Sequence, residues 1–181
     1  MPPSQRRERE RADRQELILR TARSIAESDG WDAVTTRRLA ERIEYSQPVL
    51  YSHFAGKREI VAAVAVEGFA ELTAVLRAAP DLVAAYVEFG LAHPALYDAM
   101  FSLAIGLPWG SPDAPRPLLD AFGELRTAFG PYAGDADPDA YAEVCWSTLH
   151  GLVTLARSGR LRGDLAAQRQ AIATRMMTAR K

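Results

Sequence analysis

Apolar residues recur at helical spacing along most of the chain, and no segment alternates as a β-strand does. The pattern is clearest between residues 14 and 30, where Leu17, Ile18, Ala22, Ile25 and Ala26 line one side of a helix that Gly30 ends. Further helices are predicted over residues 36–43, 46–56, 57–79, 81–92, 93–101, 117–129 and 138–158, and from residue 164 onward. The sequence therefore predicts an all-α fold.

Polarity and helix length divide the chain into three parts. The opening segment "QRRERERADR" is polar and mixed in sign, so residues 1–13 are expected to form a flexible N-terminal arm. Residues 14–60 contain the short helices, and residues 61–181 contain the longer ones. We expect a small N-terminal domain at 14–60, followed by a larger helical bundle at 61–181.

Composition narrows the class of protein further. The net charge is −1, but residues 1–60 carry +2 and the remainder carries −3, a weak indication of an anionic partner near the N-terminal third. A single cysteine, Cys145, excludes a disulfide framework and paired-cysteine metal sites. No cofactor or metal is predicted. There is no run of about 18 apolar residues and no secretory signal, so we expect a cytoplasmic protein without a membrane segment.

Two short helices at 36–43 and 46–56 are joined by a turn of the length found in helix-turn-helix units. Leu50 and Phe54, four residues apart, share the face that must meet Leu39, Ala40 and Ile43. Pro48 is tolerated because the first helical turn has no amide partner to lose. The remaining positions of the second helix must then face outward.

Those outward positions suit a DNA major groove. Gln47 can pair with adenine through its amide, and Val49 can contact a thymine methyl group. Donors for phosphate oxygens are supplied by Thr36, Tyr51, Ser52 and His53. Arg37, Arg38 and Lys57 add positive charge, with Lys57 beside a helix N-terminus. From spacing alone, a helical hairpin with a solvated polar face explains the pattern equally well.

The segment "VTTRRLAERIEYSQPVLYSHFAGKREIVAAV" resembles the DNA-binding domain of the tetracycline-repressor (TetR) family of bacterial regulators. The resemblance covers about Leu17 to Val64 and includes the "LYSHF" core and the Gly-Lys after it. It implies that the third helix docks in the major groove and that a C-terminal helical domain binds an effector and dimerises. The DNA-facing positions it implies are Thr36, Arg37, Gln47, Pro48, Val49, Tyr51, Ser52, His53 and Lys57.

The chain departs from that family pattern at Glu44, where the family usually has glycine at the first turn position. If the turn requires a positive φ there, a side chain costs about 1 kcal/mol. The carboxylate would also weaken binding to phosphates.

The helix at 138–158 carries Trp146 and the pair His150-Gly151, and "AHPALYDAMF" lies upstream. These features resemble a TetR subgroup named for its Trp and His-Gly residues. The wide apolar arc of this helix indicates burial on two sides, one of them against a second copy of the chain. The predicted dimer interface comprises Cys145, Leu149, Leu152, Ala156, Leu165, Ile172 and Met176.

A small-molecule effector pocket is predicted among the aromatic residues of the C-terminal part. Its candidate lining is Tyr97, Met100, Phe101, Trp109, Phe122, Trp146 and His150. Ordinary core packing explains aromatic residues at helical spacing equally well. The pattern slightly favours His150 as a core histidine, held by Glu143 or a backbone carbonyl, over His150 as a ligand contact.

Catalysis finds no support. Cys145 and His150 are five residues apart and diverge by about 140° around a helix, too far for a nucleophile–base pair. No phosphate-binding glycine loop and no metal-binding helix motif is present. The prediction is a dimeric regulator, more readily a repressor than an activator, that leaves a palindromic operator in double-stranded DNA when an effector binds. The alternative is a helical protein-interaction module whose helix-turn-helix no longer reads DNA.

Overall fold

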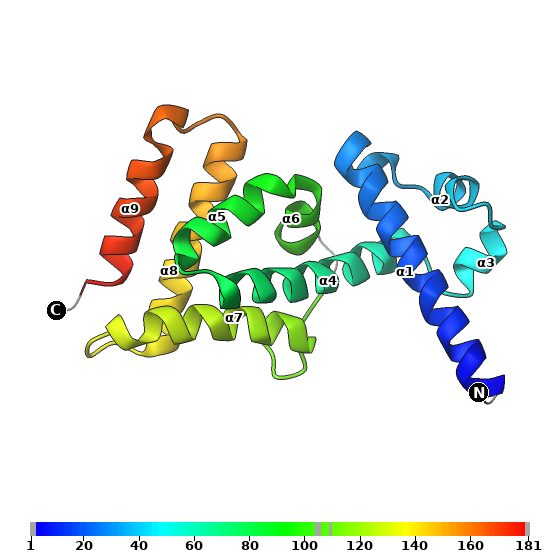
Figure 1. Ribbon diagram of the computed structural model, residues 1–181, viewed down its shortest axis with the longest axis horizontal. Coiled ribbons are helices and arrows are strands. Elements are labelled where there is room, and N and C mark those ends of the chain that lie inside the picture. Colours follow the sequence, from blue (N-terminus) through cyan, green and yellow to red (C-terminus); the bar gives the residue numbers. More distant parts are fainter. Residues whose placement is uncertain (1–2, 104–105, 109, 180–181) are drawn as a thin grey trace. The chain divides into compact units, whose positions relative to one another are not determined.

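The computed structural model describes residues 3–103, 106–108 and 110–179, and within these ranges the chain is built of helices without a β-strand. The all-α prediction is confirmed (Figure 1). The helices are α1 (Pro3–Asp29), α2 (Thr36–Arg42), α3 (Gln47–Tyr51), α4 (Lys57–Ala78), α5 (Leu82–Ala92), α6 (Pro94–Phe101), α7 (Arg116–Phe129), α8 (Pro138–Arg157) and α9 (Ala166–Met177).

The first helix begins earlier than the polarity of the N-terminus suggested. Residues 3–13, which we expected to form a flexible arm, are the opening turns of α1. Glu10 pairs with Arg6 at 2.9 Å and with Arg14 at 3.9 Å, both at a spacing of four residues. Such pairs favour a helix by a few tenths of a kcal/mol each, roughly, and they continue the helix that the apolar residues begin at Leu17.

The chain forms two compact units, one within residues 1–68 and 95–107 and the other within residues 69–94 and 108–181. The sequence-based boundary at residue 60 instead falls inside α4, which runs unbroken to Ala78. The apolar residues of α4 continue at helical spacing up to Pro80, so no local signal ends the helix at residue 60. The segment containing α6 belongs to the first unit although it follows α5 in the chain.

In the first unit, α1 supplies a buried stripe of Ile18, Ala22 and Ile25, and Leu39 and Leu50 from α2 and α3 are equally buried. On α4, Gly68 faces the side chains of Leu96 and Met100 on α6. A Cβ atom on Gly68 would lie 2.8 Å from Leu96 Cδ1 and 2.7 Å from Met100 Sδ. Because glycine in a helix interior is unfavourable, its place here is explained by this close approach.

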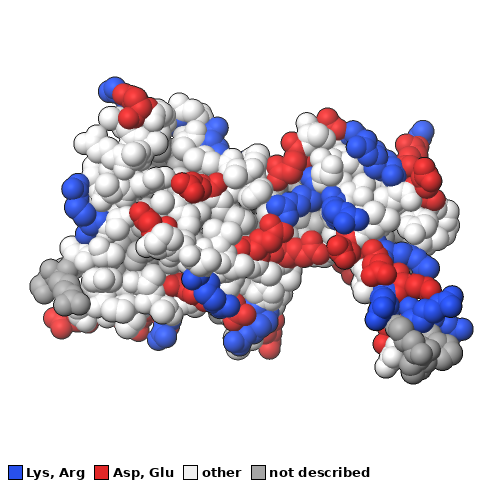
Figure 2. All heavy atoms as spheres, in the orientation of Figure 1, with Lys and Arg blue, Asp and Glu red and all other residues white. Residues whose placement is uncertain are grey.

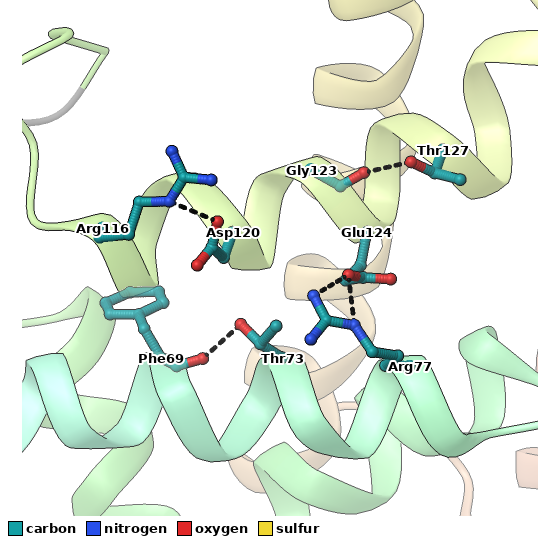
Figure 3. A network of polar contacts seen from close by, with 8 residues as sticks. All are labelled: Phe69, Thr73, Arg77, Arg116, Asp120, Gly123, Glu124 and Thr127. Atoms are coloured by element: carbon teal, nitrogen blue, oxygen red, sulfur yellow. Dashed lines mark hydrogen bonds and ion pairs between the residues drawn. The ribbon is translucent and has the colours of Figure 1, made fainter.

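In the second unit, α8 packs against α5, α7 and α9, and α8 and α9 run side by side in opposite directions (Figure 1). The α4 segment of this unit lies along α7. Figure 3 shows the guanidinium of Arg77 donating to Glu124 Oε1 from Nε at 3.0 Å and from a terminal nitrogen at 2.6 Å. The neighbouring hydroxyl of Thr73 is buried and donates to the Phe69 carbonyl at 2.7 Å. Since Arg77 is largely exposed, this pair adds little to the stability of the fold.

Candidate nucleic-acid interface

Local contacts determine where α2 begins and how its turn into α3 is made. Thr35 caps α2, because its Oγ1 accepts a hydrogen bond from the Arg38 N–H at 3.1 Å. At the other end, Glu44 has φ 58° and is the non-glycine residue with positive φ among those described. The Tyr45 N–H then donates to the Ala40 carbonyl at 3.0 Å, which closes the helix C-terminus. Glu44 therefore occupies the left-handed position that the sequence comparison had indicated.

The helix α3 buries one side and presents the other to solvent. Leu50 and Phe54 are buried, as are Leu39 and Ala40 on α2, so the predicted packing face is confirmed. Gln47 is the first residue of α3, and it is exposed together with Pro48. Tyr51 is 53% exposed, whereas Val49 is half-buried. The exposed positions lie at the start and along the outer side of the helix, where a recognition helix meets base edges.

Two basic residues of α2, Arg37 and Arg38, have partners within the protein. Arg37 donates to Glu41 at 2.8 Å but remains largely exposed. Arg38 pairs with Asp29 at the end of α1, and this hydrogen bond lowers the pKa of Asp29. Thr36 is half-buried in the first turn. A phosphate at this surface would therefore compete with Glu41 and Asp29 for the donors of Arg37 and Arg38, or share those donors with them.

Ser52 and His53, at the C-terminal end of α3, make contacts of their own. The Ser52 hydroxyl donates to the Val49 carbonyl at 2.7 Å, which leaves its oxygen to accept but its proton engaged. The His53 ring is half-buried, and its Nδ1 is buried without a hydrogen-bond partner among the described residues. Burial, followed by the positive charges of Arg11 and Arg14, lowers the pKa of His53. The ring is thus neutral near pH 7, and a phosphate contact can come only from its other nitrogen.

Lys57 opens α4, and its ammonium donates to the carbonyl of Trp31. The same turn is closed by Glu59, whose carboxylate accepts from the Ala55 N–H. An ammonium has three donors, so a carbonyl partner orients Lys57 and leaves two protons for another acceptor. Figure 2 shows positive and negative side chains interspersed over α1 and α2, in agreement with the small net charge of this part of the chain.

The residues predicted to line an effector pocket fall in both units. In the first unit, Tyr97 and Met100 are fully buried on α6, and the Tyr97 ring lies 4.6 Å from that of Phe101. In the second unit, the rings of Phe122 and Trp146 are 6.4 Å apart, and the Trp146 indole N–H donates to the Tyr86 hydroxyl at 2.9 Å. Trp109 lies outside the described residues.

His150 belongs to the same unit as Trp146, one turn further along α8, and is half-buried. Burial, with the charge of Arg157 as a smaller cause, lowers its pKa. His150 is therefore a neutral, half-buried side chain near pH 7, at helical spacing from Trp146.

The structure corrects two of the predicted dimer-interface residues. Cys145 and Leu149 are buried within the protomer, because this side of α8 faces its own neighbouring helices, so neither has surface left for a second copy. Burial also raises the pKa of the Cys145 thiol to about 11. Ile172 and Met176 are exposed on α9, whereas the other predicted positions, Leu152, Ala156 and Leu165, are half-buried.

The exposed apolar positions of α8 are instead Val144, which is 65% exposed, and Leu155. With Thr148 and Gly151 they form a stripe at spacings of four, three and four residues. The Tyr141 hydroxyl donates to the Met177 carbonyl at 3.1 Å, which ties the start of α8 to the end of α9. The sequence shows that α8 has two apolar faces at helical spacing, but it does not show which of them is buried within the protomer and which is exposed.

One contact of the first unit was not anticipated. The carboxylate of Glu27 accepts hydrogen bonds from the Ala95 and Leu96 N–H groups, both at 3.1 Å, and thus caps α6 from the end of α1. The Trp31 indole N–H donates to the Ala95 carbonyl at 2.7 Å. These partners are more than 60 residues apart, and nothing in the spacing of a lone glutamate on α1 indicates such a bond.

No helix among the described residues is long and apolar enough to cross a membrane. Residues 18–64 match the family model for bacterial regulatory proteins of the tetR family, and residues 79–179 match the model for the C-terminal domain of tetracyclin repressor-like proteins.

Individual proteins give the same result. The HTH-type transcriptional regulator Rv0681 of Mycobacterium tuberculosis is 26% identical over 155 residues, which are 80% of this chain and 70% of that protein. Tetracycline repressor protein class C of Escherichia coli is 46% identical over 50 residues, but these are only 28% of this chain and 23% of that protein. The crystal structure of regulatory protein SCO4313 shares the fold, with a TM-score of 0.72, 21% identity, and coverage of 94% of this chain and 98% of that chain.

The N-terminal match covers the helix-turn-helix described above, and the C-terminal match spans more than half of the chain. The protein therefore belongs to the TetR family of bacterial transcriptional regulators, in which the helix-turn-helix binds DNA.

Proposed function

We propose that the protein is a homodimeric repressor that binds a palindromic operator through α3 and leaves it when a small-molecule effector binds. The observation that carries the DNA part of this proposal is the outer side of α3. Gln47, Pro48 and Tyr51 are exposed there, while Leu50 and Phe54 anchor the helix from behind. A polar helix held rigidly by its apolar side is suited to reading base edges.

The proposed roles divide between base and backbone contacts. Gln47 reads a base edge, and Val49 contacts a thymine methyl group. Thr36, Tyr51 and the outer nitrogen of His53 contact phosphates, with Arg37, Arg38 and Lys57 supplying charge. Ser52 does so once its hydroxyl turns from the Val49 carbonyl to the phosphate. Because bacterial DNA lies in the cytoplasm, we place the action of the protein there. The proposal contains no catalytic step.

Dimerisation is proposed to use the exposed stripe on α8, formed by Val144, Thr148, Gly151 and Leu155, together with Ile172 and Met176 on α9. Two recognition helices must lie about 34–36 Å apart to enter successive major grooves. We propose that a change in the distance between the two recognition helices releases the protein from its operator. The effector must bind the wrongly spaced state more tightly than the DNA-bound state, since equal affinity would shift nothing.

The polar aromatic cluster Tyr86, Phe122, Trp146 and His150 supports an effector site within the second unit. The helix α4 runs from the DNA-binding unit into this one and is the proposed route of the change. In the first unit, α6 is tied to α1 through Glu27 and is therefore expected to move with it.

The experiment that tests the DNA proposal is selection of bound duplexes from a random pool, with the wild type and Gln47→Ala run side by side. The wild type is expected to enrich a palindrome. Gln47→Ala should lose preference at one symmetric pair of positions, at about 1–3 kcal/mol per contact. Lys57→Ala should instead weaken binding to all sequences alike and flatten the salt dependence. Failure of the wild type to enrich any sequence at low salt would favour the interaction-module alternative.

A further inference from the structure

The N-terminal turns of α1 extend beyond the core of the first unit and carry arginines on a defined side. Ile18, Ala22 and Ile25 form the buried stripe of α1. At about 100° per residue, Arg7, Arg11 and Arg14 lie within roughly 40° of the same stripe, continued about one to three turns toward the N-terminus. All three are exposed. The side of α1 that is apolar and buried from Ile18 onward thus carries exposed arginines in the turns before Ile18.

This arginine face lies next to the recognition helix. Figure 1 shows α3 and the residues after it beside the N-terminal half of α1, within the same compact unit. In agreement, the positive charges of Arg11 and Arg14 act on the ring of His53, which follows α3. Figure 2 shows positive side chains, with acidic ones among them, at the N-terminal end of α1. Since α1 and α3 belong to the same compact unit, a DNA duplex that receives α3 in its groove would lie beside these side chains.

The charges of the face are largely uncompensated. Arg14 lies 3.9 Å from Glu10, but no ion pair is found for Arg7 or Arg11 within the described part of the chain. The acidic residues of these turns, Glu8, Glu10 and Asp13, lie about 60–120° away from Arg7 around the helix. A guanidinium presents a planar fork of donors that suits phosphate oxygens.

We propose that Arg7 and Arg11 bind the sugar–phosphate backbone that borders the groove occupied by α3. This inference rests on the proposed function, because it presupposes that α3 enters DNA. It adds a second contact site, outside the helix-turn-helix, that holds the protein on the duplex without reading bases. The N-terminal residues then serve as part of the DNA-binding surface.

The test compares two double variants that remove the same charge from opposite sides of α1. Arg7→Ala/Arg11→Ala removes the proposed contacts, and Arg9→Ala/Arg20→Ala removes two arginines about 200–220° away from Arg7. Alanine is at least as good a helix former as arginine, so circular dichroism should show the helix retained in both. Binding to the selected duplex is then titrated by fluorescence anisotropy over a range of salt concentrations.

The expected result is a loss of at least about tenfold in affinity at low salt for Arg7→Ala/Arg11→Ala, with the selected consensus unchanged. The slope of log K against log salt should become shallower by about 0.9 for each lost phosphate contact, or about 1.8 for each protomer. The control variant should keep the wild-type slope. Trimming the ends of the duplex should weaken the wild type and leave Arg7→Ala/Arg11→Ala unaffected.

Equal slopes for the two double variants would overturn the inference, because the effect would then reflect net charge and not this face. So would an unchanged affinity for Arg7→Ala/Arg11→Ala, or equal sensitivity of all variants to duplex trimming. In each of these outcomes the wild type still selects an operator, so the proposed function stands and only the inference about Arg7 and Arg11 fails. If the wild type selects no sequence at all, the proposed function has failed, and this inference fails with it.

Discussion

Glu44 combines a backbone cost with an electrostatic one. Its φ of 58° places an L-residue with a side chain in the left-handed region, at a cost of about 1 kcal/mol, and its carboxylate is exposed in the turn between α2 and α3. The turn nevertheless closes, because Tyr45 bonds to the Ala40 carbonyl behind it. The residue therefore affects stability and DNA affinity separately, and the two effects can be measured by different substitutions.

Glu44→Gln should tighten DNA binding several-fold at low salt, since it removes a negative charge near phosphates and keeps the backbone as it is. Glu44→Gly removes the charge as well, but it should also raise the free energy of unfolding by up to about 1 kcal/mol. Anisotropy titration and urea denaturation check the two expectations. Glu44→Ala is the control for the backbone, because it should show no gain in stability. A gain equal to that of glycine would mean that the left-handed position carries no strain.

His53 and His150 make the stability of the protein depend on pH. Burial lowers both pKa values below the ordinary value of about 6.5. Below that pH the unfolded chain binds protons that the folded chain does not, so the free energy of unfolding should decrease as pH falls from about 7 and level off below the folded-state values. Urea denaturation between about pH 8 and pH 5 measures this. Replacing both residues by glutamine should flatten the profile, and an unchanged profile would assign the pH dependence to other groups.

The residue scale also shows where sequence reasoning about the site succeeded. Leu50 and Phe54 could be assigned to the core because a helix of this length has one apolar side, and the outward position of Gln47 followed. What spacing could not show is how each donor is already used. Lys57 is bound to the carbonyl of Trp31, and this partner depends on where another element lies.

Among the elements, α6 is positioned more by contacts from other helices than by its own sequence. It is capped by Glu27 of α1, hydrogen-bonded by Trp31, and packed against the bare backbone of Gly68 on α4. Three separate elements therefore determine where it begins. Because all of these residues lie in the DNA-binding unit, a displacement of α6 would first alter its contacts with α1 and α4.

Glu27→Ala should lower the free energy of unfolding by about 1–2 kcal/mol, because it removes the cap of α6 and leaves two N–H groups without an acceptor. Glu16→Ala is the matched control on α1, since Glu16 makes only an exposed pair with Arg20 at 3.8 Å and should change stability by less than about 0.5 kcal/mol. Urea denaturation of both variants gives the comparison. Equal effects of the two substitutions would mean that the cap adds no stability beyond that of a surface charge.

At the scale of the whole molecule, the association of two copies is expected to depend on the exposed stripe of α8. Val144→Glu should shift the protein toward monomer at micromolar concentrations and weaken operator binding, because a charge would be buried between the copies. Sedimentation velocity measures the association state. Cys145→Ala, at the next position of the helix, should stay dimeric and lose only about 1 kcal/mol of stability as a core truncation. Dimer loss with Cys145→Ala instead would return the interface to the face first predicted.

The sequence by itself determined the helical class, the helix-turn-helix and the side of α3 that faces outward. These follow from periodicity, capping residues and glycine or proline positions, all of which act over a few residues. The tertiary structure alone decided which apolar face of α8 is internal, where α6 is anchored, and that the N-terminal arginines lie beside α3. Each of these depends on contacts between residues far apart in the chain, and the energy of such a contact appears only once the helices are packed.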